Sequence, residues 1–472
     1  MTTFFLLPLP YLSLGLLALL FGAVFCSPRF PSFNRRRIAL VVLGFSLVMF
    51  VLALLKIQVR SVTAESDPWL PCFSTDAIDG LPLVVFLFVA ILAVCLAPRR
   101  DIRDRCLSGI FLLVTGTTCI YASNHLWVVN LGWWLTCVPF VGAFFGRTED
   151  HKQTSIALIV SAILLTLSTI FLHASHWSNV ANISQWSLFF LVMTVILRKG
   201  IFPFHSWTLR SFESGPLLPK ALLFNSHLGA LLVARAQSSG MSVLDHPSLE
   251  WLSILALVTA LVTSLRGLIE KKPRRLMAFV CISQASFILS GLLATNAEGV
   301  MGGMLHWMVV TLASTALIGI VRILEVRVID VADPTVPLGL AVRAPRLAVF
   351  FLISGLALVG LPGTMGYCAE DLLFHGVQDH HSVMGVALLL ATAINAINLM
   401  RLYSVLFLGV LPKNVIEVPD ALPRERWPLT ALMMILIVGG LYPRWPIALR
   451  HDAVKSIPLR VNDLPHHEDG LH

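Results

Sequence analysis

The chain has 472 residues, of which 57% are hydrophobic and 13% are charged, and its mean hydropathy is +0.82. This composition excludes an ordinary soluble protein, because apolar runs of roughly 17 to 25 residues, long enough to cross about 30 Å of hydrocarbon, recur along the sequence. The formal net charge of +8 comes mostly from basic loops between these runs, so we expect no nucleic-acid binding. We expect the chain to be surrounded by membrane lipid.

In chain order, the apolar runs predict about 14 membrane-spanning helices. They lie near residues 4–26, 38–57, 80–98, 106–123, 126–146, 154–172, 183–202, 217–236, 249–267, 276–294, 300–321, 346–362, 382–408 and 427–446. The first run follows no basic residue and contains no small-residue cleavage site, so we expect a retained helix rather than a signal peptide. The predicted fold class is an all-α polytopic membrane protein.

Basic residues are concentrated in alternate loops. They are Arg29, Arg35, Arg36, Arg37, Arg99, Arg100, Arg103, Arg105, Lys271, Lys272, Arg274, Arg275, Arg322, Arg327, Arg343 and Arg346. The positive-inside rule makes these loops cytoplasmic and places both termini on the outer, periplasmic side of the cell inner membrane. The tail after the last span carries four basic residues that oppose this orientation, and the short loops are given more weight.

The sequence contains no motif for chemistry on a soluble substrate. There is no soluble domain, Gly-rich phosphate loop or heptad run, and the eight cysteines form no CxxC pair and lie mostly within apolar runs. We therefore expect neither a disulfide framework nor a metal site. The chain is expected to have no catalytic site and no cofactor of its own, so work on a soluble substrate falls to a partner.

Ionisable residues at bilayer depth cost at least ~2.5 kcal/mol on insertion scales and usually mark an ion path. The first such cluster runs from Leu197 to Trp207, where Gly200 and Pro203 should break the helix. Arg198 and Lys199 either snorkel to the interface or include a buried cation of a proton path. Lysine suits a relay because it can lose its charge on burial, whereas arginine stays protonated. His205 would either pass protons or serve as a hydrogen-bonded structural residue.

The second cluster follows Gly360, where Pro362 and Gly363 favour two half-helices joined by a loop. Glu370 and Asp371 come directly after this break. They are either a proton site at the outward end of a path or acids of a surface loop.

Three further ionisable residues fall inside predicted spans: His227, His306 and Arg401. A lone histidine on a helix is more often structural than conducting. Together, however, three such residues at similar depth would form a polar axis between the clusters.

These motifs resemble those of a known family, the antiporter-like subunits of respiratory complex I. The family includes Mrp cation antiporter subunits, membrane-bound hydrogenase subunits and the membrane subunit of the DabA/DabB inorganic-carbon pump. The resemblance covers roughly residues 80 to 410. It is carried by the segment from Arg198 to Trp207, by Arg274-Arg275-Leu276-Met277-Ala278-Phe279 with Ile282-Ser283-Gln284, by the segment from Gly360 to Glu370, and by Asn395 to Gly409 with Arg401-Leu402-Tyr403.

The resemblance implies a fold of 14 helices with two inverted five-helix repeats and with helices seven and twelve broken. The implied organisation is N-terminal helices at 1–105, a first repeat at 106–236, a second repeat at 249–408, a last helix at 427–446 and a tail at 447–472. It also implies a hydrated central axis, in which Arg198 takes the place of the family's helix-seven lysine and Glu370 that of the helix-twelve acid.

The departures from the family pattern bear on mechanism. Where the complex I subunits resemble Trp-Glu-x-x-x-x-Pro in helix five, this chain has Trp134 at the acidic position, five residues before Pro139. The helix-eight Lys or His falls near Phe224, with His227 as a substitute one turn on. Arg198 therefore lacks the buried glutamate that would pair with it. This argues against an ion pair that forms and breaks in each half cycle.

Three hypotheses follow. The first is a proton- or cation-conducting subunit that uses an ion gradient to energise a partner, most specifically for CO₂ or bicarbonate uptake with a cytoplasmic zinc protein resembling a carbonic anhydrase (DabA-type). The second is a redox-driven proton-pumping subunit of a complex I-like or hydrogenase complex. The third is a structural membrane anchor that no longer conducts.

Overall fold

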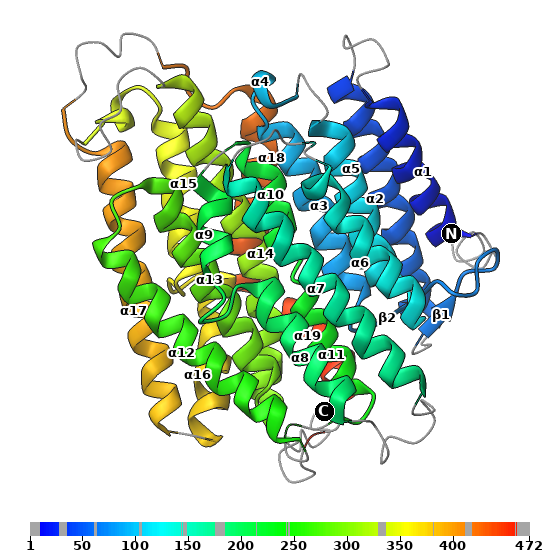
Figure 1. Ribbon diagram of the computed structural model, residues 1–472. Coiled ribbons are helices and arrows are strands. Elements are labelled where there is room, and N and C mark those ends of the chain that lie inside the picture. The colour runs from blue at the N-terminus through cyan, green and yellow to red at the C-terminus, as the bar shows by residue number, and fades with distance from the viewer. Residues whose placement is uncertain are drawn as a thin grey trace, which may run out of the picture.

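The computed structural model describes residues 10–27, 35–60, 64–102, 106–142, 144, 149–174, 185–213, 215–241, 243, 246–328, 337–380, 382–410, 418–457 and 459. In this part of the chain the helices lie side by side in one bundle (Figure 1). They are α1 (Tyr11–Phe25), α2 (Arg35–Arg60), α3 (Gly80–Leu96), α4 (Arg99–Ile102), α5 (Cys106–Tyr121), α6 (Leu126–Val141), α7 (Glu149–Ala174), α8 (Gln185–Lys199), α9 (Ser206–Glu213), α10 (Leu217–Asn225), α11 (Leu228–Ser238), α12 (Pro247–Ile269), α13 (Pro273–Leu292), α14 (Ala297–Arg327), the short 3-10 helix η4 (Leu340–Val342), α15 (Pro345–Leu358), α16 (Met365–His380), α17 (Ser382–Phe407), α18 (Pro423–Leu441) and α19 (Arg444–Lys455).

Many of these helices have the length and composition of membrane spans. Among the described residues, seven helices are long and apolar enough to cross a membrane, or eight if α18 and α19, bent by 83°, form one span. Five further apolar helices are shorter: α1, α3, α5, α6 and α15. The predicted polytopic, mostly helical class agrees with this architecture, while the count of about 14 spans stays a prediction.

Proline and glycine set many of the helix boundaries. α12, α13, α15 and α18 each begin with a proline, whose fixed φ suits the first helical turn and whose missing N–H is not needed there. One boundary lacks this signal. The predicted span at 217–236 corresponds to one of the seven candidate spans, Leu217–Ser238, but it contains a break, since α10 ends at Asn225 and α11 begins at Leu228, with His227 at φ 46 between them.

One segment is not helical. β1 (Ala64–Ser66) and β2 (Ser74–Asp76) form an antiparallel hairpin with Ala64 opposite Asp76. The Ser74 N–H donates to the carbonyl of Ala122 at 2.8 Å, which fixes the hairpin to the end of α5. The all-helical expectation is wrong at this loop, where backbone groups outside helices pair with each other instead.

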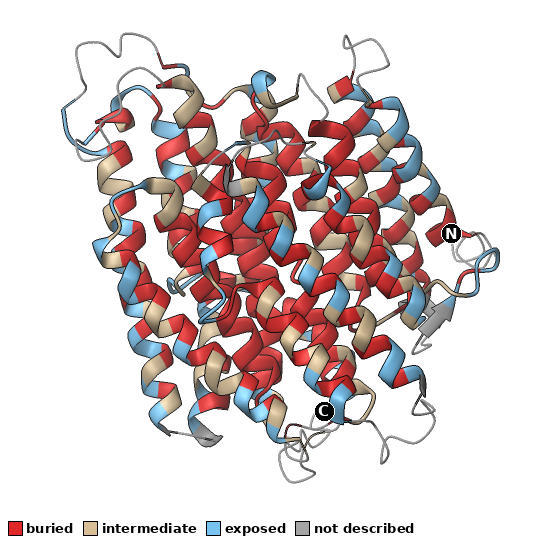
Figure 2. Ribbon diagram, viewed as in Figure 1, coloured by how far each residue is buried: buried red, intermediate tan, exposed pale blue. Residues whose placement is uncertain are grey.

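The centre of the bundle is dense and apolar, and Figure 2 shows buried residues concentrated along the inner helices. α14 is the most extensively packed of these, with contacts to α3, α10, α13, α15 and α16. Glycines bring α14 and α16 together, since a Cβ added at Gly376 would meet the backbone of Gly299 at 2.2 Å. Such small-residue contacts are how membrane helices approach closely.

The two ends of the bundle differ in structure. At one end, ion pairs join helix ends: Arg322–Asp101 at 2.6 Å, Arg274–Glu325 at 2.6 Å and Arg327–Glu425 at 2.7 Å. At the other end lies the β1–β2 hairpin. The start of α1 is at the hairpin end, because the Ser13 N–H donates to Asp67 at 3.0 Å.

Candidate functional site

The first buried charged cluster lies where α8 stops. α8 ends at Lys199, Gly200 takes the left-handed φ of +66°, and α9 begins at Ser206. Gly200 and Pro203 both lie in the connecting segment. A side chain at Gly200 would be strained by that φ and would also meet Thr208 Oγ1 at 2.6 Å. The break places both basic side chains inside the protein, since Arg198 is 4% exposed and Lys199 is 3% exposed.

Arg198 is held by α6. Its Nη2 donates to Thr136 Oγ1 at 2.7 Å, its Nη1 lies 3.7 Å from Cys137 Sγ, and its guanidinium lies 4.9 Å from the centre of the Trp133 ring. No carboxylate of the described residues forms an ion pair with it. Trp134 faces elsewhere, because its indole N–H donates to Thr166 Oγ1 at 3.2 Å. Arg198 is thus a buried cation held by a hydroxyl, a sulfur and an aromatic face.

Lys199 contacts the break between α10 and α11. Its Nζ lies in hydrogen-bond contact with His227 Nδ1, and the same Nζ is 5.3 Å from the centre of the Phe224 ring. His227 is fully buried and is the only non-glycine residue with positive φ among the described residues. Such a conformation is uncommon for histidine and marks a constrained position. An amine and an imidazole in contact can exchange a proton.

Polar side chains continue from His227 across α13 and α14. The His227 ring centre is 6.3 Å from that of Trp307, the neighbour of His306. His306 Nε2 lies 2.8 Å from Gln284 Oε1, and both side chains are fully buried. Beside Gln284, the Ser283 hydroxyl accepts from Asn395 Nδ2 of α17 at 2.8 Å. We call Lys199, His227, His306 and Gln284 the buried polar route; its two halves are the Lys199–His227 contact and the His306–Gln284 contact, and Trp307 lies beside His227.

The second break lies between α15 and α16. Gly360 and Gly363 have φ of +69° and +87°. Gly360 also leaves room for an acid, since a Cβ there would meet Glu370 Oε2 at 2.5 Å. Glu370 Oε1 is buried and has no hydrogen-bond partner among the described residues, and Thr392 of α17 lies beside the carboxyl group. Pro362 and Gly363 lie in the loop that separates the two helices.

Three predicted site residues lie away from this route. Asp371 is 51% exposed on the outer face of α16, with His375 beside it. His205 lies half-buried at the start of α9, its ring stacked 5.7 Å from that of Phe202. Arg401 donates to backbone carbonyls at the end of α12, including that of Gly267 at 3.2 Å. It therefore satisfies carbonyls that the helix end leaves free.

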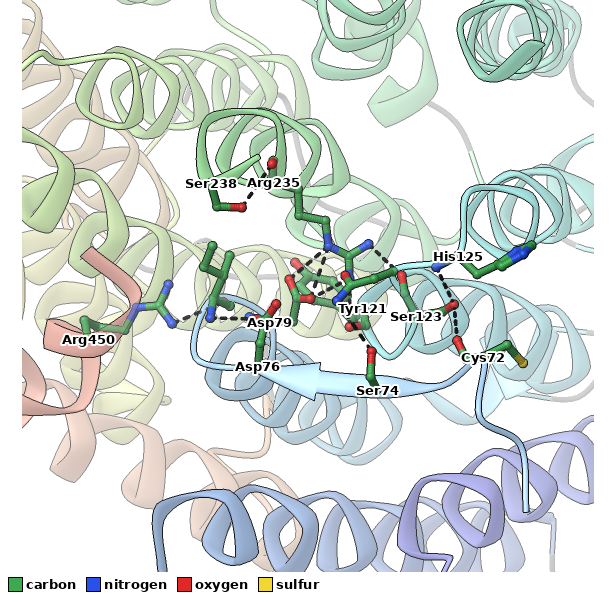
Figure 3. A network of polar contacts seen from close by, with 12 residues as sticks. Cys72, Ser74, Asp76, Asp79, Tyr121, Ser123, His125, Arg235, Ser238 and Arg450 are labelled. Carbon is green, nitrogen blue, oxygen red and sulfur yellow. Dashed lines mark hydrogen bonds and ion pairs between the residues drawn. The ribbon is translucent and has the colours of Figure 1, made fainter. Parts of the chain in front are cut away.

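A second polar network, at the hairpin end, was missed by the sequence reasoning (Figure 3). Arg235 holds the fully buried Asp79 with its Nη2 2.6 Å from Oδ2, and it also donates to the carbonyl of Tyr121 at 3.0 Å. Arg450 of α19 donates to the carbonyls of Ala77 and Ile78. Arg235 falls within a predicted span, so the rule that flagged Lys199 would have flagged it as well.

This outer network connects to the axis. The Tyr121 hydroxyl donates to the carbonyl of Ser226 at 2.7 Å, directly before His227. α11 then runs from the Lys199 contact at its first residues to Arg235 in its last turn. The His227 break and the Asp79–Arg235 pair are thus the two ends of one short helix. No group of three or more potential metal ligands occurs among the described residues.

Helices broken inside a membrane bundle, with buried ionisable side chains at the breaks, define a membrane protein of the ion-translocating class. The family model for the transmembrane region of NADH:quinone oxidoreductase and Mrp antiporters matches residues 123–395. That match covers more than half of the chain, and the protein belongs to this antiporter-like family of multi-pass membrane proteins.

Similarity to known proteins in sequence and in structure supports this assignment. The chain is 24% identical over 381 residues to NADH-quinone oxidoreductase subunit M of Rickettsia bellii, covering 74% of each chain. A chain of the archaeal membrane-bound sulfane sulfur reductase superposes with a TM-score of 0.81 at 17% identity, covering 95% of this chain and 96% of that one. A chain of respiratory complex I from Thermus thermophilus gives a TM-score of 0.79 at 19% identity, covering 94% and 100%. At these identities the two structures establish the fold alone.

Proposed function

We propose that the protein is a proton-conducting membrane subunit of a multi-subunit complex and that it uses an ion gradient to energise a partner. The observation that carries this proposal is the contact between Lys199 Nζ and His227 Nδ1, fully inside the bundle and at two helix breaks. Family membership supports the class of activity. Buried amine and imidazole groups in contact have little structural purpose that an apolar pair would not serve better.

In this proposal Lys199 passes a proton to His227, and His306 with Gln284 continues the route toward α17. Arg198 stays charged and acts as a fixed electrostatic gate beside Lys199, because guanidinium groups do not lose their proton in proteins. Glu370 is the acidic site at the far end of the route. His205, Asp371 and Arg401 are kept outside the conducting route by their positions, respectively half-buried, exposed and bound to backbone carbonyls.

The proposed topology has about 14 spans in two inverted five-helix repeats, with the basic end of the bundle in the cytoplasm. Ion pairs gather the basic loops at that end. The start of α1 and helix α19 both contact the hairpin region at the opposite end. This arrangement supports a chain in the cell inner membrane with both described ends on the periplasmic side.

The most specific form of the proposal is inorganic-carbon uptake, with a cytoplasmic zinc protein resembling a carbonic anhydrase as the partner. It is favoured by the surroundings of Arg198, which is held by Thr136, Cys137 and Trp133 rather than by a carboxylate. A cation without a local counter-charge does not support an ion pair that switches with a redox cycle. The chain itself would need no catalytic site, metal or cofactor.

A second candidate is a redox-driven pump subunit. The name of the matched relative, a subunit of an NADH-quinone oxidoreductase, favours it. Purifying the full chain from its native membranes and identifying what co-elutes separates the two forms: a large zinc protein supports the first, and quinone-side or hydrogenase subunits support the second.

Conduction is tested with the full chain in proteoliposomes. An imposed pH gradient should collapse faster than in empty liposomes, and the Lys199→Met variant should lose this acceleration. Replacing K⁺ by Na⁺ in the buffer shows whether Na⁺ is carried. The same assay is run with the purified native complex. If liposomes that contain this complex kept the pH gradient as long as empty liposomes do, the proposal would be overturned.

A further inference from the structure

The outward face of α16 is polar, whereas the exposed surface of the neighbouring helix α17 is apolar. Asp371 and His375 are 51% and 58% exposed, and Tyr367 one turn earlier is 45% exposed. Gln378 continues the same stripe. These residues follow a spacing of three to four, which places them on one side of the helix. We call them the α16 stripe: Tyr367, Asp371, His375 and Gln378.

The depth of the α16 stripe in the membrane follows from the neighbouring helix α17. α16 ends at His380, α17 begins at Ser382 and the two helices contact each other, so residues equally far in sequence from this joint lie at about the same level. Asp371 precedes the joint by ten residues, about 15 Å of helix. Leu390 follows it by nine and is 50% exposed. The surface of α17 is also apolar further from the joint, where Ile397 is 52% exposed. Asp371 therefore lies at hydrocarbon depth.

The stripe is bordered by apolar surface on its other side as well. The end of α18 meets the first turn of α16, where Gly439 approaches Met365, and Leu441 next to this contact is 63% exposed. A carboxylate facing hydrocarbon is costly, and such residues otherwise face protein or water. The contact with His375, whose Nδ1 is 3.7 Å from the Asp371 carboxylate, leaves half of the Asp371 side chain uncovered.

We propose that the α16 stripe is the docking site for a transmembrane helix of a different subunit, which places a hydrogen-bond donor or a cation opposite Asp371. A second copy of this chain is a poor occupant. In a two-fold dimer with its axis along the membrane normal, the two Asp371 side chains would lie at the same depth, and like charges would meet. A donor group on a different helix complements the carboxylate instead. This surface does not depend on whether the chain conducts protons.

The test uses a photo-crosslinking amino acid placed at position 371 in the full chain, in native membranes, with position 397 as the matched control on the apolar face. Position 371 should give one discrete adduct whose added mass corresponds to a different membrane protein, and position 397 should give none. An adduct at twice the mass of this chain, or lipid adducts alone at both positions, would overturn the proposal.

A second variant separates docking from folding. Asp371→Leu should leave the Tm of the detergent-purified chain unchanged or raise it. The fraction of the chain that assembles with its partner in native membranes should fall about tenfold, as expected for losing one hydrogen bond to a charged group. Ile397→Ala is the control and should change neither. A lower Tm with unchanged assembly would show that Asp371 supports this chain's own fold, which contradicts a docking role.

Discussion

The α8–α9 and α15–α16 helix breaks carry opposite charge. At the α8–α9 break Arg198 and Lys199 are buried without an ion-pair partner among the described carboxylates, whereas at the α15–α16 break Glu370 is partly buried without one among the described cations. Arg235 and Asp79, by contrast, form a close ion pair at 2.6 Å. At the two breaks, a mobile proton rather than a fixed counter-ion can balance the buried charge.

The largest expected effect concerns the cationic break. Lys199→Met removes the amine that contacts His227, so no group at position 199 can accept or pass on the proton, and conduction in proteoliposomes should fall about 100-fold. Arg401→Gln is a suitable control, because Arg401 donates to backbone carbonyls at the end of α12. Equal rates for Lys199→Met and the unmodified chain would remove the cationic break from the path.

The acidic break should respond next. Glu370→Gln keeps the shape of the side chain but removes its titration, and the rate measured in the same assay should fall about tenfold. Glu370→Asp should retain more activity because a carboxyl group remains. The anchor hypothesis predicts instead that the activity of the whole complex is untouched by Glu370→Gln.

A smaller effect is expected at the surroundings of Arg198. Thr136→Val removes the oxygen 2.7 Å from Nη2, so a buried donor is left unsatisfied and the free energy of unfolding should drop by about 1–3 kcal/mol. Denaturation with SDS in mixed micelles measures this change, with Thr136→Ser as the variant that keeps the hydroxyl. Equal stability of the two variants would mean that Trp133 and Cys137 hold Arg198 on their own.

The smallest effect is expected for Trp134→Glu. The family pattern places an acid there, but the Trp134 side chain is directed toward Thr166 of α7 and away from Arg198. The new carboxylate should therefore not pair with Arg198, and conduction should change less than twofold, on the order of 0.4 kcal/mol or below. A tenfold change would show that position 134 communicates with Arg198 and that the two breaks differ less than their contacts indicate.

Sequence reasoning located both Gly/Pro breaks and the charged residues at them, because glycine and proline act through local backbone geometry. It could not determine side-chain direction. Glu370 and Asp371 are adjacent, yet one turns toward Thr392 and the other away from the bundle. Neighbouring helical residues point about 100° apart, and only the packing partners decide which one is inside.

Other features depended on contacts that are distant in sequence. The two residues that link α10 to α11, Ser226 and His227, are neither glycine nor proline. The break there involves the Lys199 contact from α8 and the Tyr121 hydrogen bond to the Ser226 carbonyl. The Asp79–Arg235 pair joins residues 156 positions apart. No local pattern encodes such a pairing, although an arginine in an apolar span signals that some partner exists.

The length of α14 has a geometric consequence. Its 31 residues extend about 46 Å, well beyond the about 30 Å of hydrocarbon, so the helix must tilt or project. Its last turns carry Arg322 and Arg327, which are tied to Asp101 and Glu425. The last turns of α14 are thus fastened to α4 and α18 at the basic end, and a protein that binds this end of the bundle would contact the same helix that holds His306.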